Sequence, residues 1–306
     1  MIYLLHSGSE LIEEAINNCK YKDKIVLINP TLNSKILRGI RKAHNMTNLR
    51  TKKIWVDYLL KKQQVDNSKL DTVIVFDTPL WIDNIEYIRE RFSNAKIIFW
   101  FWNIIKDKTK INKIKMNCNS IFIFDENEAK KYQIKYHPQF HWITKTSDDK
   151  IKNDIFFVGR NKGRLFILEN FYEKCMQEKL TVKYHVVKDK KNDFSEVVNL
   201  KSQSMVYEEV IEEVKQSKCI LDINQEGQAG LTLRALEALF LKKKLMTNNK
   251  DIANYDFYRE NNIQFLDENN ICIDKEFISS KFQDVDNEII EKYTVDHWLE
   301  TLIYSE

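Results

Sequence analysis

Short apolar runs alternate with longer amphipathic stretches along most of the chain. In the first half, the runs predict strands at residues 2–5, 24–28, 72–76, 96–102 and 120–124. Helical spacing of apolar positions predicts helices between them, at residues 10–19 and 82–92, and one or two more between 33 and 64. Strands that are apolar along their whole length and separated by helices are typical of a parallel sheet covered on both faces.

The alternation pauses in a polar stretch at residues 136–154, which has no clear period and predicts a linker. It resumes with strands predicted at 154–159, 180–187, 218–224 and 245–247 and with helices at 163–177, 204–217 and 230–244. We therefore expect an α/β protein of two doubly wound, Rossmann-like domains whose parallel sheets face each other across a cleft. The expected boundaries are 1–145 and 153–285 for the two domains, and 286–306 for a C-terminal helix that packs back on the first domain.

Composition supports this picture and narrows the function. The 306 residues are 43% hydrophobic and 12% aromatic, which supplies cores for two domains and excludes a disordered chain. Lysine and arginine total 48 against 45 acidic residues, a net charge of +3 that weighs against a dedicated nucleic-acid binder. The five cysteines form no C-x-x-C pair, which favours reduced thiols over disulfides or a zinc site. With no signal-peptide pattern at the N-terminus and no apolar run of spanning length, we expect a cytoplasmic protein.

Four of the six glycines fall in two loops that each follow a predicted strand and precede a helix. The first loop, "VGRNKGRL", holds Gly159 and Gly163 beside Arg160, Lys162 and Arg164. A strand–glycine–helix junction points backbone N–H groups and the positive end of a helix at one spot, and the three cations add to its attraction for an anion. Neither loop has the P-loop or dinucleotide fingerprint. A solvated basic turn remains the alternative.

The second loop and its helix read "QEGQAGLTLRALEAL". Gly227 and Gly230 free the backbone. The hydrogen-bonding side chains are Gln225, Gln228 and Thr232. Arg234 and Glu237 lie three apart and so share one face of a helix that is otherwise apolar from 231 to 241. Two interpretations stay open: a carboxylate that binds a ribose diol while phosphates sit at the helix start, or an intrahelical ion pair.

The segments "DIFFVGRNKGR" and "YEEVIEEVKQSKCILDINQEGQAGLTLRALEALFLKKKLMTNN" resemble GT-B-fold glycosyltransferases of bacterial capsule, lipopolysaccharide and exopolysaccharide biosynthesis. The likeness covers residues 154–248. It implies an acceptor-side first domain, a nucleotide-sugar-binding second domain and hexosyl transfer to a surface-glycan or lipid-linked acceptor. It also implies that Glu237 binds the ribose, and that Arg160, Lys162 and Arg164 neutralise the leaving nucleoside diphosphate. The diphosphate loop would comprise Gly227, Gln228, Gly230, Leu231 and Thr232.

The sequence departs from this family in two places. The common signature has two glutamates eight apart, whereas Glu226 and Glu237 are eleven apart (237 − 226), so the first glutamate's role is not transferred to Glu226. The N-terminus reads "HSGSE" after the first strand and lacks a glycine-rich loop. A non-catalytic glycosyltransferase-like subunit that binds a partner protein, and a nucleotide-sugar epimerase, therefore remain as alternatives.

The expected chemistry needs no metal or cofactor. The only D-x-D motif, Asp284 to Asp286, follows no strand, so cations and helix-start amides would meet the charge of the leaving group. If transfer inverts the sugar configuration, a base must take the acceptor proton. Asp77, directly after a predicted strand, is the first candidate and His6 the second, with turn or capping roles as their alternatives.

The lysine- and arginine-rich stretch at residues 34–53 predicts a basic helical face. A solvated surface is one interpretation. The other is peripheral contact with anionic lipid at the inner face of a membrane, with Ile36, Leu37 and Ile40 entering the interface beside a lipid-linked acceptor.

Overall fold

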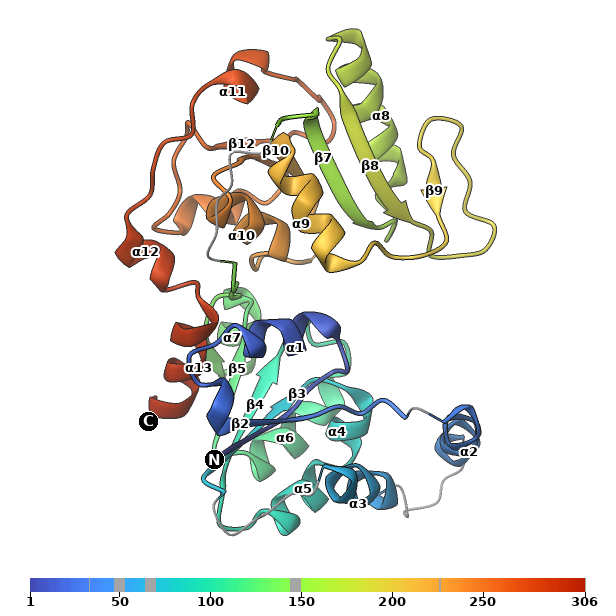
Figure 1. Cartoon of the computed structure of the whole chain (residues 1–306), viewed down its shortest axis with the longest axis vertical. Helices are drawn as coiled ribbons and strands as arrows, with labels where there is room; N and C mark the ends of the chain where they lie inside the picture. Colours follow the sequence, from blue (N-terminus) through green and yellow to red (C-terminus); the bar gives the residue numbers. More distant parts are fainter. Residues whose placement is uncertain (33, 47–52, 64–69, 144–149, 226, 306) are drawn as a thin grey trace. The chain divides into compact units, whose positions relative to one another are not determined.

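The computed structural model describes residues 1–32, 34–46, 53–63, 70–143, 150–225 and 227–305. The chain forms two compact units, Met1–Pro138 with Val295–Glu306, and Gln139–Thr294. Each unit contains one six-stranded sheet with helices on its faces (Figure 1).

The first sheet is parallel throughout, with strand order β2-β1-β3-β4-β5-β6. Its strands are β1 Ile2–Leu5, β2 Ile25–Ile28, β3 Thr72–Phe76, β4 Lys96–Phe101, β5 Ser120–Ile123 and β6 Lys135–Tyr136. Its helices are α1 Glu10–Asn17, α2 Lys35–Asn45, α3 Lys53–Lys62, α4 Pro79–Asp83, α5 Ile85–Arg91, α6 Ile111–Asn117, α7 Glu126–Tyr132 and α13 Val295–Tyr304. The chain runs from β1 outward to β2 and then returns to the other side of β1 as β3. The order therefore reverses between β1 and β3, which is the switch point where such sheets bind ligands.

The second sheet is also parallel, with order β12-β11-β10-β7-β8-β9. Its strands are β7 Asn153–Arg160, β8 Val182–Val187, β9 Leu200–Lys201, β10 Ser217–Asp222, β11 Lys244–Thr247 and β12 Ile263–Phe265. Its helices are α8 Leu165–Gln177, α9 Tyr207–Lys215, α10 Leu233–Phe240, α11 Lys275–Ser279 and α12 Asn287–Glu291. Here the order reverses between β7 and β10.

Alternate residues of the second sheet enter two separate cores. Ile155 and Phe157 of β7 belong to one buried cluster, whereas Phe156 between them belongs to the other. Successive side chains of a strand point to opposite faces, so both faces of this sheet are covered by apolar groups. The expected α/β class with two Rossmann-like sheets is confirmed.

The boundaries of single elements differ in places from those expected. The helix expected at 82–92 is two helices, α4 and α5, with Asn84 between them and its side-chain amide donating to the carbonyl of Leu80 at 2.8 Å. The helices expected near the C-terminus divide between the units, since α12 belongs to the second and α13 to the first. In the first unit, Trp298 of α13 is buried with its ring centroid 5.6 Å from that of Trp100.

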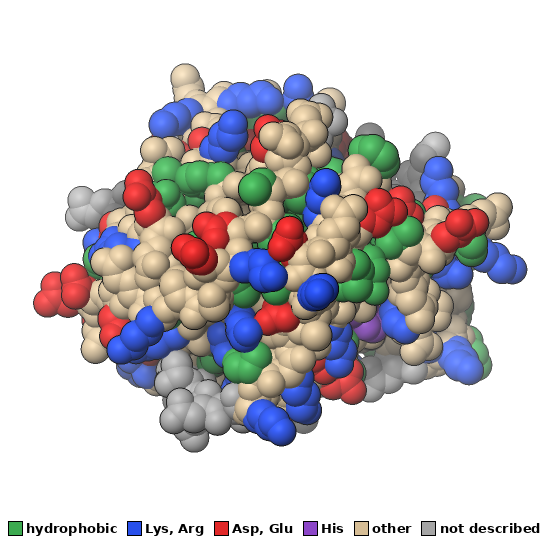
Figure 2. Space-filling model, turned by 90° about the horizontal axis from the view of Figure 1, so that it is seen from above, with side chains coloured by type: hydrophobic (Ala, Val, Ile, Leu, Met, Phe, Trp, Pro, Cys, Tyr) green, Lys and Arg blue, Asp and Glu red, His purple; other side chains and the backbone are tan. Residues whose placement is uncertain are grey.

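Charge is mixed on the face of the molecule that Figure 2 shows. On the face shown in Figure 2, acidic and basic side chains lie interspersed without a large region of one sign. This agrees with the low net charge and differs from the basic stripe typical of nucleic-acid-binding domains.

Candidate functional site

The two glycine-bearing loops of the second unit start side by side. Strand β10 pairs in parallel with β7, with Cys219 opposite Ile155 and Ile220 opposite Phe156. The carboxyl ends of both strands therefore meet at one edge of the sheet, on either side of the switch point. The position where an open α/β sheet binds its ligand is thus formed by these two loops.

Two arginines bind the loops to each other. Arg164, which precedes α8, is only 6% exposed and donates hydrogen bonds to the carbonyls of Ile223 and Arg160. Arg234 of α10 donates to the carbonyl of Val158 at 2.7 Å and to the carboxylate of Asp222 at 2.8 Å. Each arginine thus reaches from the helix after one strand to the backbone at the end of the other strand.

Gly159 makes room for both guanidinium groups. A Cβ atom at this position would lie 3.0 Å from Nη1 of Arg234 and 3.3 Å from Nη2 of Arg164. Both guanidinium groups also lie over the ring of Phe157, at 5.3 Å for Arg234 and 5.4 Å for Arg164. Gly159 is the penultimate residue of β7, not part of the loop, so close approach of side chains explains this glycine better than a turn does.

The electrostatics of this junction favour an anion. Arg234 pairs with the buried carboxylate of Asp222, which also attracts Arg164, and the charges of the two guanidinium groups repel each other. Burial and the nearby charge of Arg234 together lower the pKa of Arg164 to about 10, against the attraction of Asp222 and Asp189. A bound phosphate would relieve this repulsion between the two cations.

Arg160 and Lys162 lie differently from Arg164. The Arg160 side chain is 50% exposed, and its Nε donates to Asp189 at 3.1 Å. The other oxygen of Asp189 accepts the backbone N–H of Lys162 at 2.5 Å. Of the three cations of the first loop, Arg164 alone lies within the junction, because Asp189, after β8, holds the outer part of the loop. The contact of Asp189 with Arg160 and Lys162 could not be predicted from the sequence, because Asp189 lies far from them along the chain.

Asparagine side chains hold the second loop in place. Asn248 accepts the backbone N–H of Asn224 at 2.7 Å, and Asn249 donates to the carbonyl of Ala229 at 3.0 Å. Within the loop, Gln225 donates to the side chain of Gln228 at 3.2 Å. Gly227 has a φ of +80°, a backbone conformation that favours glycine. Gly230 and Leu231 are buried, and Leu231 packs into the apolar core at the end of the loop. Glu226 lies outside the described residues.

Thr232 joins the start of helix α10 to the end of β10. The hydroxyl of Thr232 accepts the N–H of Ala235 at 3.2 Å, which caps the helix, and donates to Asp222 at 2.8 Å. The first turn of α10 is thereby fixed at the switch point, with the positive end of its dipole toward the loop.

Glu237 lies one turn into α10 and is only 2% exposed. Arg234 forms its ion pair with Asp222. The alternative ion pair, between Arg234 and Glu237 on the same helix, is not observed between these two described residues. The carboxylate is hydrogen-bonded by Tyr207, while its Oε2 atom has no hydrogen-bond partner among them. Burial raises the pKa of Glu237 to about 7, against the attraction of Arg234 and the Tyr207 hydrogen bond.

The first unit places both candidate bases at its own switch point. Oδ2 of Asp77, after β3, accepts the backbone and side-chain N–H groups of Asn103 at 3.0 and 3.2 Å. Burial raises the pKa of Asp77, while the bonds from Asn103 lower it. The carboxyl group borders a pocket whose apolar wall includes Ile82, Phe101 and Ile105.

His6, after β1, is fully buried. Its Nδ1 accepts the N–H of Gly8 at 3.3 Å, and its Nε2 lies 3.6 Å from Glu13. Burial lowers the pKa of His6 to about 4, against the charge of Glu13. The imidazole is therefore neutral with its proton on Nε2, which leaves no free lone pair for base catalysis. Asp77 fits the role of base better.

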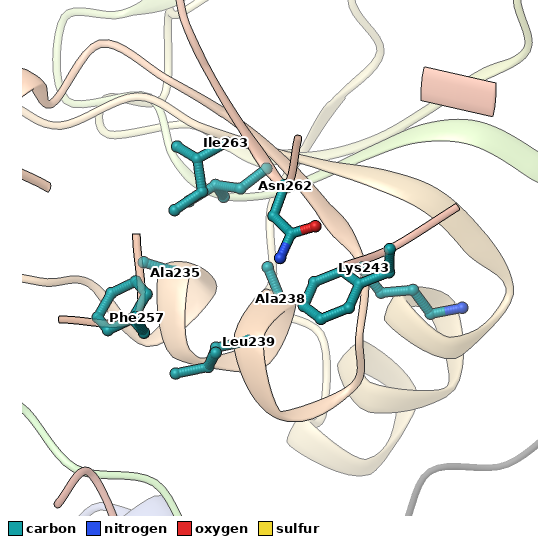
Figure 3. A pocket seen from close by; sticks show the side chains of 9 residues that line it. Ala235, Ala238, Leu239, Lys243, Phe257, Asn262 and Ile263 are labelled. Carbon is teal, nitrogen blue, oxygen red and sulfur yellow. The ribbon is translucent and has the colours of Figure 1, made fainter. Parts of the chain in front are cut away.

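Two other features carry no candidate site. The pocket in Figure 3 lies against Ala235, Ala238 and Leu239 of α10, and its one buried amide, Asn262, is bonded to both backbone groups of Gln283. Among the described residues, no cluster of three histidine, cysteine, aspartate or glutamate side chains could hold a metal ion. Within the D-x-D motif, Asp284 pairs with Lys242 at 2.6 Å.

Comparison with known proteins finds solved structures of similar fold. No protein-family model and no curated protein matches the sequence. The chain is similar to the crystal structure of Anabaena Alr3699/HepE in complex with UDP and glucose, with a TM-score of 0.62, 10% identity and coverage of 100% of this chain and 99% of the other. It is also similar to TarM, with a TM-score of 0.55, 15% identity and coverage of 81% of this chain and 57% of the other. The chain thus spans little more than half the length of TarM.

At these identities the likeness establishes architecture. The protein has the two-domain, Rossmann-like fold of GT-B glycosyltransferases, as the sequence predicted.

Proposed function

We propose that this protein is a GT-B glycosyltransferase that moves a sugar from a nucleotide-sugar donor to an acceptor. The observation that carries the proposal is the junction of β7 and β10, where the guanidinium groups of Arg164 and Arg234 lie together beside the start of α10. A UDP complex of the similar Anabaena HepE supports a nucleotide as the ligand.

The donor would lie across this junction. Its diphosphate is met by backbone N–H groups of the loop from Gly227 to Thr232 and by the dipole of α10, with Arg164 and Arg234 behind them. The ribose diol donates to the unpartnered oxygen of Glu237. Because fixed positive charge at this point can stabilise the departing diphosphate, the reaction proceeds without a metal ion.

The acceptor would bind at the first unit. Asp77 takes the proton of its hydroxyl, since Asn103 occupies Oδ2 and leaves the carboxylate oriented at the edge of the pocket. We propose a surface glycan or a lipid-linked sugar as acceptor, in bacterial capsule or other polysaccharide biosynthesis, at the cytoplasmic side of the membrane.

Peripheral membrane contact is part of this proposal. In α2, Ile36 and Ile40 are 75% and 52% exposed, and the exposed residues Lys35, Arg38 and Lys42 flank them on the same helix. Exposed apolar side chains beside cations suit an interface with anionic headgroups. No described helix is long and apolar enough to cross a bilayer.

A panel of UDP, GDP, ADP, CDP and dTDP tests the proposal by thermal shift and calorimetry. We expect one of them to stabilise the protein, and Glu237→Ala to abolish the effect. The absence of any shift across the panel would contradict donor binding. Nucleotide binding without transfer or donor hydrolysis would favour the non-catalytic subunit, and conversion of the donor without an acceptor would favour the epimerase.

A further inference from the structure

Glu237 belongs to a chain of polar groups, buried at both ends, that the donor site itself does not explain. Nε2 of His141 lies 2.9 Å from the hydroxyl of Tyr207, the first residue of α9, and this hydroxyl in turn is hydrogen-bonded to Glu237. His141 is fully buried, and Glu237 is almost so. Three residues from separate segments of the second unit therefore form one continuous chain.

The direction of each hydrogen bond follows from the surroundings of His141. Its Nδ1 accepts the backbone N–H of Ile143 at 3.1 Å, so in the neutral ring the proton is on Nε2. Burial lowers the pKa of His141 to about 3, which keeps the ring neutral. Nε2 then donates to the Tyr207 oxygen, and the Tyr207 proton is left to be donated to Glu237.

Aromatic packing holds this chain in place. The ring of Trp142 lies 5.2 Å from that of Tyr207 and stacks on His141 at 4.9 Å. Phe240 of α10 packs against His141 at 5.1 Å. The backbone N–H of His141 also donates to Tyr293 at 2.7 Å. These contacts restrict the orientation of the Tyr207 ring, whose hydroxyl meets His141 and Glu237.

We propose that Tyr207, held by His141, is a positioning residue that fixes the Glu237 carboxylate and leaves Oε2 to accept the hydroxyls of a ribose. The inference rests on the proposed nucleotide binding at Glu237. A buried carboxylate oxygen without a partner is costly, and a diol would satisfy it. Without Tyr207, the carboxylate is free to rotate toward Arg234 or to take up a proton.

The arrangement predicts a pH-dependent donor affinity. The charged and titratable groups that act on Glu237 are Arg234, Asp222 and Tyr207. The Tyr207 hydrogen bond lowers the pKa of Glu237, whereas burial raises it to about 7. Loss of the tyrosine hydroxyl should therefore move the protonation of Glu237 to higher pH and weaken the binding of a diol at neutral pH.

The experiment measures the Kd of the best-binding nucleotide of the panel by calorimetry from pH 5.5 to pH 9. For Tyr207→Phe, we expect a Kd about tenfold higher at pH 7 and a midpoint of the pH dependence above that of the wild type. Tyr184→Phe is the matched control, because Tyr184, like Tyr207, is partly buried and among the described residues donates to the carbonyl of Leu168 at 3.3 Å. It should bind as the wild type does at every pH. Titration of the nucleotide phosphate is common to all variants and cancels in the comparison.

A second pair of variants keeps the test decisive if Tyr207→Phe folds poorly. His141→Leu removes the donor to Tyr207 and should weaken binding, whereas His141→Gln keeps an N–H and should restore part of it. The inference would be overturned if Tyr207→Phe, or both His141 variants, had the same Kd and the same midpoint as the wild type. That result would leave the proposed function intact. If the wild type binds no nucleotide of the panel, the proposed function itself fails, and the inference fails with it.

Discussion

Arg234 forms its ion pair with Asp222, 2.8 Å away at the end of the neighbouring strand, and not with Glu237 on its own helix. The pair closes the junction between β7 and β10, because the same guanidinium also donates to the carbonyl of Val158. It leaves Glu237 without a cationic partner among the described residues, inside a helix that is otherwise apolar. The structure thus separates two side chains that the sequence placed on adjacent turns: Arg234 holds the loops, and Oε2 of Glu237 is left without a hydrogen-bond partner among the described residues.

Asp222→Asn should destabilise the protein by about 3 kcal/mol, because it leaves a largely buried guanidinium without its counter-charge. Urea unfolding measures this change. Asp284→Asn, which breaks the exposed pair with Lys242, is the control and should leave the free energy of unfolding unchanged. Equal effects of the two substitutions would show that Asp222 does not hold the junction.

Gly159→Ala should cost about 1–3 kcal/mol of stability and weaken nucleotide binding, because its Cβ would meet Arg234 at 3.0 Å and Arg164 at 3.3 Å. Thermal unfolding and calorimetry report the two effects. Gly39→Ala is the control, since nothing lies within 4 Å of a Cβ at that helical position, and alanine there should stabilise slightly. Undiminished binding by Gly159→Ala would separate the arginines from the ligand.

Glu237→Gln should stabilise the protein at pH 8 and change little at pH 5. The pKa of Glu237 is raised from 4.5 to about 7 in the folded state, so the native protein binds more protons than the unfolded chain between these values. Stability contributed by the protonated form is complete below about pH 4.5 and is lost as the pH rises to 7, which amounts to about 3 kcal/mol at pH 8. Denaturant unfolding at both pH values measures the difference. A gain that is equal at pH 5 and pH 8 would contradict the raised pKa.

Asp77→Asn should reduce transfer by about 10²–10⁴-fold and leave nucleotide affinity unchanged, because Asp77 lies in the unit that does not hold the donor loops. The raised pKa of Asp77 should appear as an acid limb of kcat/KM above the usual aspartate range. Transfer is followed by release of the nucleoside diphosphate in the presence of acceptor. Full activity of the variant would exclude Asp77 as the base and favour a retaining mechanism.

A double substitution of Ile36 and Ile40 by glutamate should reduce binding to vesicles that contain phosphatidylglycerol. Flotation with these vesicles and with neutral phosphatidylcholine vesicles separates the charged from the apolar contribution. Phe166→Glu is the control, since Phe166 is 70% exposed but lies on α8 of the other unit. Equal vesicle binding by the double variant and the wild type would contradict the proposed membrane contact.

The sequence by itself determined the alternation of strands and helices and hence the fold. Continuous apolar runs predicted nearly all longer strands within one or two residues, because a strand buried on both faces has no polar positions to confuse the pattern. Strands of two or three residues, such as β9 and β12, were not predicted, since so short a segment has no measurable period. The glycine-bearing loops were found for a similar local reason: each directly follows a recognisable strand.

Only the tertiary structure decided which side chains meet at the site. Asp189, His141 and Tyr207 come from separate segments, and their contacts with Arg160 and Glu237 depend on how strands and helices far apart in the chain pack together. The spacing of charges along α10 left open an ion pair between Arg234 and Glu237, but Arg234 pairs with the carboxylate of Asp222 once β10 and α10 are packed. Burial then gave Glu237 its high pKa, a property of the folded environment that no local pattern in the sequence contains.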